Sequence, residues 1–136
     1  NVAAVLHNLA VIAQEQGDIE EAQRLYDESL EIYKKLGNQS GLASVLHALG
    51  ALAHSQGDIT EARRIYGESL EAMKKLGDKS NIAIIYLNLG LLEEEEKNRE
   101  EAARLFREAL SMFEKLKSPY AEKARGGLER VEGEGS

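Results

Sequence analysis

The three histidines are the side chains of this chain best suited to metal binding or to acid–base catalysis. His47 and His54 lie two turns apart on one helical face, about 10.5 Å, which is too far for both to hold one metal ion without long reaches. His7 and His47 occupy equivalent positions in a repeated sequence. The chain holds no H-E-x-x-H pair, glycine-rich phosphate loop or nucleophile elbow. We therefore expect no metal, no cofactor and no catalytic activity.

Cysteine and the charged residues narrow the chemistry further. The absence of cysteine removes disulfides, thiolate catalysis and Cys-based zinc sites. Most carboxylates fall in the charge-rich helical segments, where partners four residues away, such as Lys75 for Glu71, explain them. The net charge of −7 disfavours nucleic acid, including RNA, and anionic membranes as partners. The uncharged runs are too short to span a bilayer, and nothing resembles a signal peptide. These features predict a cytoplasmic protein. The start at Asn1, without methionine, is compatible with a domain cut from a longer chain.

The elements that must position these residues repeat every 40 positions. Residues 1–40 and 41–80 align without a gap and are identical at more than half of their positions, and 81–118 form a third, more diverged copy. A fixed period in this range is typical of a solenoid, in which each unit buries its apolar face against its neighbours.

Each copy contains two helical patterns separated by a turn. In the second copy, Gly57 ends the first helix, Asp58 is the N-cap of the second, and Glu61 completes a capping-box pattern. The third copy has Lys97-Asn98 at this turn, where a lysine should fit less well than glycine. The patterns predict helices over 2–16, 19–36, 42–56, 59–76, 81–96, 99–117 and 120–131, with Pro119 suited to the first turn of the last helix.

The pattern resembles the tetratricopeptide repeat. The resemblance rests on Leu46, Leu49-Gly50 and Ala53 in the first helix of the second copy, and on Ala62, Tyr66 and Ser69 in its second helix. The 40-residue length is similar to the repeats of kinesin light chains, Leu-Gly-Asn-repeat polarity proteins and bacterial or archaeal signalling ATPases. The resemblance implies an all-α, right-handed solenoid of αα-hairpins. We expect one body over 1–132, with repeats 1–40, 41–80 and 81–118, a capping helix over 119–132 and a disordered tail over 133–136.

The first helix of each repeat is almost free of charge, whereas the second helices carry nearly all charged residues. A helix without charge around its circumference is buried on several sides or covered by a partner. In the family, the stripe of the first helices that is not core lines a concave groove. Three such helices about 10 Å apart would form a groove of roughly 30 Å. The predicted binding residues are His7, Asn8, Val11, His47, Ala51, Leu87, Asn88, Leu91 and Glu94.

We therefore predict a non-catalytic protein-interaction module that binds a short peptide or an amphipathic helix, apolar with basic residues. A clamp for a C-terminal carboxylate, known in some family members, is not expected because the groove positions hold no lysine or arginine. The alternative is a regulatory or oligomerisation segment of a larger signalling protein, with the same surface packed on its own chain or on a second copy. In addition, the exposed apolar side of the first helix (Val2, Val5, Leu9, Ile12) predicts a homodimer.

Overall fold

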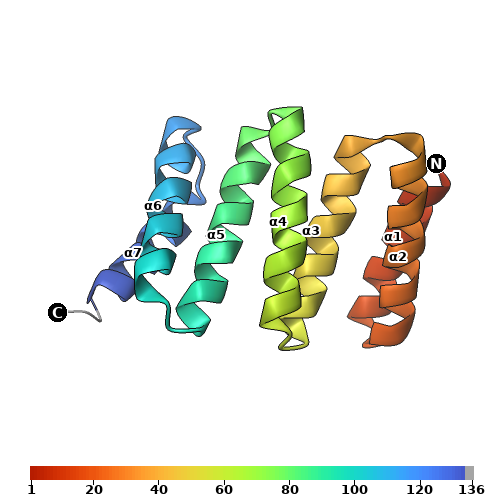
Figure 1. Ribbon diagram of the computed structural model, residues 1–136, viewed down its shortest axis with the longest axis horizontal. Coiled ribbons are helices and arrows are strands. Elements are labelled where there is room, and N and C mark those ends of the chain that lie inside the picture. Colours follow the sequence, from red (N-terminus) through yellow and green to blue (C-terminus); the bar gives the residue numbers. More distant parts are fainter. Residues whose placement is uncertain (134–136) are drawn as a thin grey trace. The chain divides into compact units, whose positions relative to one another are not determined.

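Seven α-helices follow one another in the computed structural model, which describes residues 1–133 (Figure 1). The described residues contain no strand, so the prediction of an all-α repeat fold with a C-terminal helix is confirmed. Successive helices form the antiparallel hairpins α1–α2, α3–α4 and α5–α6. The helices are α1 (Val2–Glu15), α2 (Ile19–Leu36), α3 (Gln39–Ser55), α4 (Ile59–Leu76), α5 (Lys79–Glu95), α6 (Arg99–Lys115) and α7 (Ala121–Gly133).

The chain divides into two compact units. The first extends from Asn1 to Leu76 and contains α1–α4, and the second begins at Gly77 and contains α5–α7. The expectation of a single body over 1–132 stays a prediction, and each unit is described by itself below.

Side-chain caps fix where most helices begin. The carboxylate of Asp18 accepts a hydrogen bond from the backbone N–H of Glu21 at 3.2 Å, and that of Asp58 accepts one from Glu61 at 3.1 Å. Such caps satisfy N–H groups that have no partner within the helix. The carboxylate of Glu61, predicted to complete a capping box, accepts a hydrogen bond from Nε of Arg64 at 2.5 Å.

Two helices begin earlier than the sequence pattern predicted. The start of α3 was predicted at residue 42 and that of α5 at residue 81, but they begin at Gln39 and Lys79. The cause is a second set of N-caps: Asn38 accepts from the N–H of Gly41 at 2.9 Å, and Asp78 accepts from that of Asn81 at 3.2 Å.

The last helix is also shifted. It begins after a turn that contains Pro119, which was predicted to lie inside its first turn. It extends to Gly133, the first residue of the predicted tail. The rest of that tail, 134–136, lies outside the described residues.

The turn between α5 and α6 places a lysine in the left-handed backbone region. Lys97 has φ of 62°, whereas the equivalent turns hold Gly17 at 82° and Gly57 at 78°. This conformation costs an L-residue with a side chain roughly 1–2 kcal/mol. The sequence-based expectation of a poorer fit thus has a geometric basis.

We expect Lys97→Gly to raise the free energy of unfolding by about 1 kcal/mol. Glycine removes the steric cost of the left-handed conformation, and the greater flexibility of the unfolded chain offsets part of this gain. The measurement is urea unfolding followed by far-UV circular dichroism. The reciprocal control is Gly57→Lys, which should lose a similar amount. A Cβ at Gly57 would meet no atom within 4 Å, so only the backbone conformation is tested. Equal stability of all three proteins would refute the expectation.

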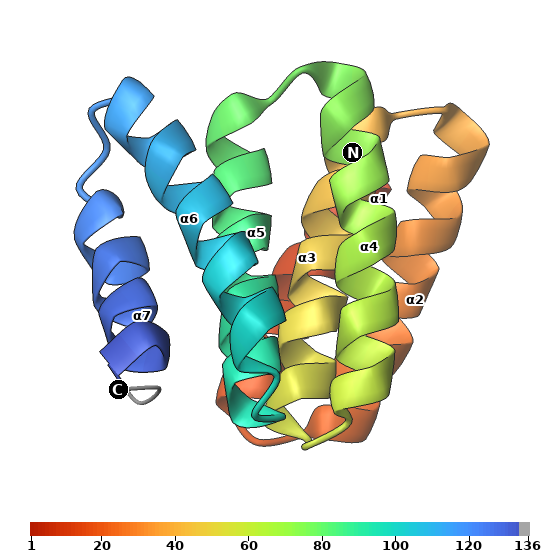
Figure 2. The same cartoon turned by 60° about the vertical axis from the view of Figure 1, so that its left-hand side comes forward.

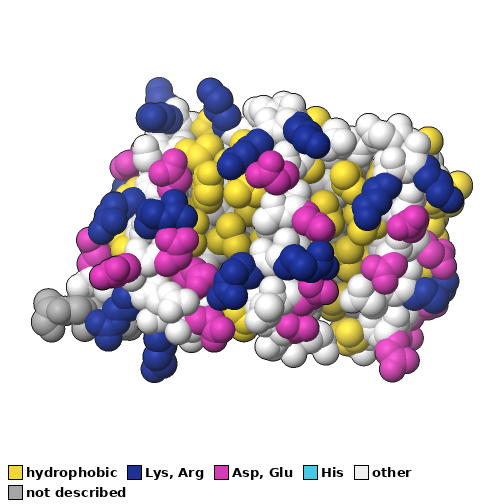
Figure 3. Space-filling view, in the orientation of Figure 1, with side chains coloured by type: hydrophobic (Ala, Val, Ile, Leu, Met, Phe, Trp, Pro, Cys, Tyr) yellow, Lys and Arg dark blue, Asp and Glu magenta, His cyan; other side chains and the backbone are white. Residues whose placement is uncertain are grey.

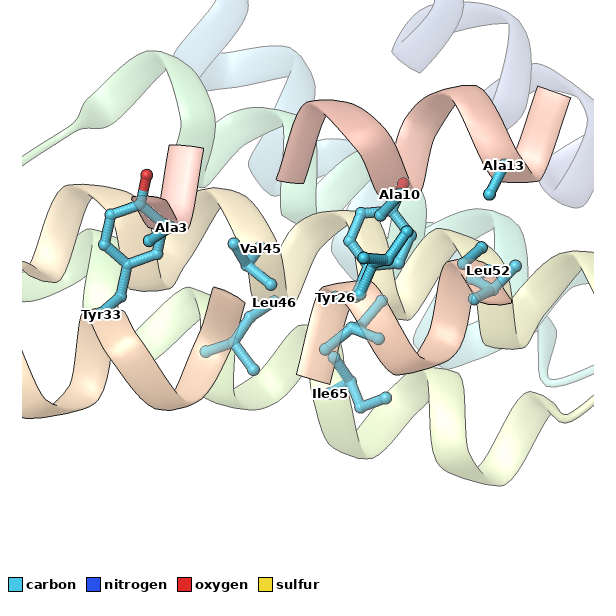
Figure 4. Packing of buried hydrophobic residues seen from close by; sticks show 12 residues of the cluster. Ala3, Ala10, Ala13, Tyr26, Tyr33, Val45, Leu46, Leu52 and Ile65 are labelled. Carbon is cyan, nitrogen blue, oxygen red and sulfur yellow. The ribbon is translucent and has the colours of Figure 1, made fainter. Parts of the chain in front are cut away.

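The core of the first unit is a cluster of alanines on α1, aromatic and aliphatic residues on α2, and a run of Val and Leu on α3 (Figure 4). In each of the two hairpins of this unit, one buried serine links the two helices. Ser29 Oγ donates to the carbonyl oxygen of Ala3 at 2.7 Å, and Ser69 Oγ donates to that of Ala43 at 3.0 Å. Ser69 is one of the residues on which the resemblance rests, and Ser29 is its equivalent in the first repeat. The structure adds that each hydroxyl bonds to the facing helix.

The core of the second unit is centred on Phe106, which is fully buried. A Cβ placed on Gly90 of α5 would lie 2.8 Å from its ring, and one on Gly127 of α7 would lie 2.7 Å from it. Phe106 therefore lies against the backbones of both helices. Figure 2 shows α7 beside α6. Ion pairs tie it there, including Arg107 to Glu132 at 3.0 Å and Arg125 to Glu114 at 3.3 Å.

Candidate functional site

The first unit has a depression of about 600 Å³ between α1 and α3. Four of the predicted binding residues, His7, Val11, His47 and Ala51, contribute to its lining. The structure therefore brings together residues that lie 40 positions apart in the sequence. The full lining is His7, Val11, Gln14, Glu15, Tyr26, Ser44, His47, Ala48 and Ala51.

Each of the two histidines of the depression lies against the tyrosine of its own repeat. The ring of His7 lies 5.7 Å from that of Tyr26 in an edge-on arrangement, and the ring of His47 lies 5.9 Å from that of Tyr66. Burial lowers the pKa of both imidazoles below the usual 6.5. Both rings are therefore neutral at pH 7 and can donate and accept hydrogen bonds without adding charge.

Tyr26 of α2 contributes to the lining of the depression although it is a core residue. Its side chain is 1% exposed, and its hydroxyl donates to Oε1 of Gln14 at 2.9 Å. The ring is therefore part of the core, and its hydroxyl is bonded to another residue that lines the depression. Gln14, Ser44 and Ala48 share the helical stripes of the predicted residues, so spacing could have found them.

Glu15 is the only charged residue that lines the depression. It is exposed at the last position of α1. The rest of the lining is apolar or neutral. The site can thus cover an apolar segment, offer it several hydrogen bonds and pair with one positive charge at its edge.

The other predicted binding residues lie elsewhere. Asn8 is exposed on α1 but does not line the depression. In the second unit, Leu87 is only 5% exposed and belongs to the hydrophobic core, so its side chain is not accessible to a ligand there. Leu91 packs partly against the same core, and Asn88 is half-buried.

Glu94 is held by α7. Its two carboxylate oxygens accept hydrogen bonds from Nε and Nη2 of Arg130, each at 2.8 Å. These hydrogen bonds from Arg130 are the main reason that the pKa of Glu94 lies below its usual value. The sequence analysis listed Glu94 among the residues that would bind a ligand with basic residues. In the structure, its carboxylate is already paired with an arginine of α7.

The charged residues gather on the second helices, as the sequence indicated. Figure 3 shows the side on which α2 and α4 lie in front, with Lys, Arg, Asp and Glu side chains along both helices. Many form pairs within their helix, such as Arg24 with Glu21 at 2.6 Å. This surface is a solvated helix face.

The described residues contain neither a metal-binding cluster nor a membrane-spanning helix. Residues 1–133 hold no group of three or more His, Asp or Glu side chains placed to bind a metal ion. Within the same residues, no helix combines the length and apolar character needed to cross a membrane.

The fold is shared with solved structures of low sequence identity. BtubC (BKLC) from P. vanneervenii matches 95% of this chain with a TM-score of 0.86 and 20% identity. A putative kinesin light chain from Podosopora anserina with nearly identical TPR-like repeats matches 94%, with a TM-score of 0.77 and 18% identity. A signal transduction ATPase with numerous domains and a tetratricopeptide repeat sensor, from Pyrococcus horikoshii, matches 97%, with a TM-score of 0.88 and 20% identity.

The chain spans 54%, 64% and 21% of the lengths of these three proteins, respectively. No curated protein sequence is significantly similar to it. The family model for the tetratricopeptide repeat matches residues 1–75 and again residues 41–115, with the repeated residues in the same register as the hairpins described above. The chain therefore belongs to the tetratricopeptide repeat family.

Proposed function

We propose that this chain is a non-catalytic protein-interaction module that binds a short peptide segment or an amphipathic helix in the depression between α1 and α3. Tetratricopeptide repeats are a known protein-interaction fold, which supports the general role. The observation that carries the specific proposal is the lining of the depression, which combines neutral histidines, apolar Val11 and Ala51, and a single acid, Glu15.

The chemistry of the lining defines the ligand. An apolar side chain would rest on Val11, Ala48 and Ala51, and the neutral imidazoles would hydrogen-bond to a peptide backbone. A lysine or arginine of the ligand would pair with Glu15. We expect modest affinity because the depression is open and shallow and the exposed ion pair adds little. A cytoplasmic location remains part of this proposal.

A displayed peptide library selected on the wild-type protein tests the proposal. We expect apolar peptides with a basic residue. Ala51→Lys should weaken their binding at least ~10-fold, about 1.4 kcal/mol, because its side chain fills the depression and repels a basic ligand. The matched control is Gln23→Lys, on the exposed face of α2, where the equivalent residue of the next repeat is Arg63. Equal binding by both variants would place the ligand elsewhere.

The basic residue of the ligand can be tested separately. Glu15→Gln should weaken basic peptides about two- to fivefold, the range of an exposed ion pair, and leave a neutral version of the same peptide unaffected. Equal loss for both peptides would contradict a role of Glu15 in charge recognition.

The alternative is a regulatory or oligomerisation segment of a larger signalling protein. The similarity to the tetratricopeptide repeat sensor of a signal transduction ATPase favours it, as does the short share of that chain that is covered. In this case the depression would pack on the parent chain or on a second copy. The library selection would then yield no foreign peptide that discriminates between wild type and Ala51→Lys.

A further inference from the structure

Gln14 of α1 is held in place by a buried tyrosine. The hydroxyl of Tyr26 donates to Oε1 of Gln14 at 2.9 Å, and the ring of Tyr26 is buried in the core of the first unit. Burial, and after it the carboxylate of Glu15, raises the pKa of Tyr26 above its usual value, so the hydroxyl keeps its proton at neutral pH. The Gln14 amide is therefore fixed with its oxygen turned towards Tyr26.

The nitrogen of the same amide is left for a ligand. An amide has one acceptor oxygen and two N–H donors, and the oxygen of Gln14 is already bonded. Within residues 1–133, Nε2 of Gln14 makes no hydrogen bond, and no buried side-chain nitrogen or oxygen lacks a partner. Nε2 is therefore accessible, and Gln14 lines the depression. The depression thus contains oriented N–H donors that have no acceptor in the described protein.

This arrangement differs between the repeats. Gln14 corresponds to His54 and Glu94, so the position holds three different polar residues. At the position of Tyr26, the third repeat has Phe106, which is fully buried and has no hydroxyl. An aromatic ring alone is thus sufficient for the core, whereas the hydroxyl of Tyr26 also orients Gln14.

The oriented donors define the form of the ligand. They require an acceptor, and Glu15 beside them disfavours a carboxylate because two negative charges repel. The main-chain carbonyl oxygens of a peptide are neutral acceptors. In an α-helix all but the last four are bonded within the helix, so a helix laid over Gln14 would cover its N–H groups without pairing them. An extended peptide keeps its carbonyl oxygens free for such bonds.

We propose that Nε2 of Gln14 donates a hydrogen bond to a main-chain carbonyl oxygen of the ligand, so that the depression binds an extended peptide and not an amphipathic helix. Gln14 is then a specificity-determining residue, and Tyr26 is a positioning residue that acts through it. This inference rests on the proposed function and chooses between the two ligand forms that it allows.

The orientation of Gln14 can be measured in the free protein by ¹⁵N relaxation of the side-chain amides. We expect the Gln14 amide to be as ordered as the backbone of α1, and to become as mobile as that of the exposed Gln16 in Tyr26→Phe. The matched control is Tyr33→Phe, which makes the same change in a core tyrosine of α2 that does not line the depression (Figure 4). A Gln14 amide as mobile as Gln16 in the wild type, or equal loss of order in both variants, would overturn the proposal.

The donor role is tested by titration calorimetry with a peptide selected from the displayed library. Gln14→Met keeps the length of the side chain without its N–H groups, and Tyr26→Phe removes the orienting hydroxyl. Each should weaken binding about two- to tenfold, the range of one hydrogen bond, whereas Tyr33→Phe should bind as the wild type does. Wild-type affinity of Gln14→Met would overturn the proposal.

The form of the bound peptide is tested by the ¹³C shifts of its labelled carbonyl and α-carbons. We expect the values of an extended chain. Helical shifts, like wild-type affinity of Gln14→Met, would refute the inference and leave the proposed function standing. A selection that yields no peptide would refute the proposed function, and the inference with it.

Discussion

Phe106→Ala is expected to lower the free energy of unfolding of the second unit by about 3–5 kcal/mol, the usual cost of truncating a buried phenylalanine. The ring is fully buried and lies against the backbones of Gly90 and Gly127, so its removal leaves a cavity that two rigid helices cannot easily close. The measurement is native-state hydrogen exchange of the amides of α5, α6 and α7, because it reports on this unit directly.

Phe106→Tyr is the matched control. The equivalent residues of the first two repeats are Tyr26 and Tyr66, and a Cβ on Gly50 would lie 2.7 Å from the ring of Tyr66, much as one on Gly90 lies from Phe106. The tyrosine variant should therefore retain most of the stability. A loss below about 1 kcal/mol for the alanine variant would show that Phe106 does not hold the three helices together.

The second large effect concerns two adjacent glycines of α7, for which we expect opposite signs. Gly127→Ala should destabilise the second unit by about 1–3 kcal/mol, the range of overpacking, because its Cβ would lie 2.7 Å from the buried ring of Phe106. Gly126→Ala should stabilise it by about 0.5–1 kcal/mol, because alanine is the better helix former and the added Cβ would approach only Nη1 of Arg130, at 3.8 Å.

Each variant is the control of the other, because both make the same chemical change one residue apart in one helix. The comparison uses the hydrogen exchange rates of the α7 amides. Stabilisation by both substitutions would mean that helix propensity alone decides the stability of α7. Destabilisation by both would mean that α7 packs differently from the arrangement described.

The helix bounds were predictable because each repeat contains residues that end one helix and cap the next. Gly17 and Gly57 accept positive φ, and Asp18 and Asp58 cap the next helix, so the bounds of α2 and α4 follow from a local signal. The early starts of α3 and α5 had a signal of the same kind in Asn38 and Asp78. The apolar pattern of these helices begins only one turn later, so the pattern alone predicts later starts.

Only part of the candidate site was predictable from the sequence. Equivalent positions of the repeats hold different residue types, and these types differ in how deeply they are buried. His7 and His47 line the depression of the first unit, whereas Leu87 at the equivalent position is buried. A polar imidazole keeps an edge in water, while a leucine gains by full burial. Positions 7, 47 and 87 are equivalent in the repeats. Their equivalence alone does not show that the two histidines line the depression and that the leucine is buried.

The pairing of Glu94 with Arg130 lies beyond what sequence spacing can indicate. The two residues are 36 positions apart and meet because α7 contacts α5 as well as α6 in the second unit. Nothing in the local pattern distinguishes Glu94 from its neighbour Glu95. Prediction of such a contact requires the packing of the last helix, which depends on Gly127 and Phe106.

Amide chemical shifts of the isotope-labelled chain test most directly whether the depression between α1 and α3 binds a peptide. On addition of a library-selected peptide, we predict the largest shift changes at His7, Val11, His47 and Ala51. Little change is expected along the charged face of α2 and α4. Changes centred on that charged face, or on the apolar side of α1 from Val2 to Ile12, would contradict the account and place the ligand on a different surface.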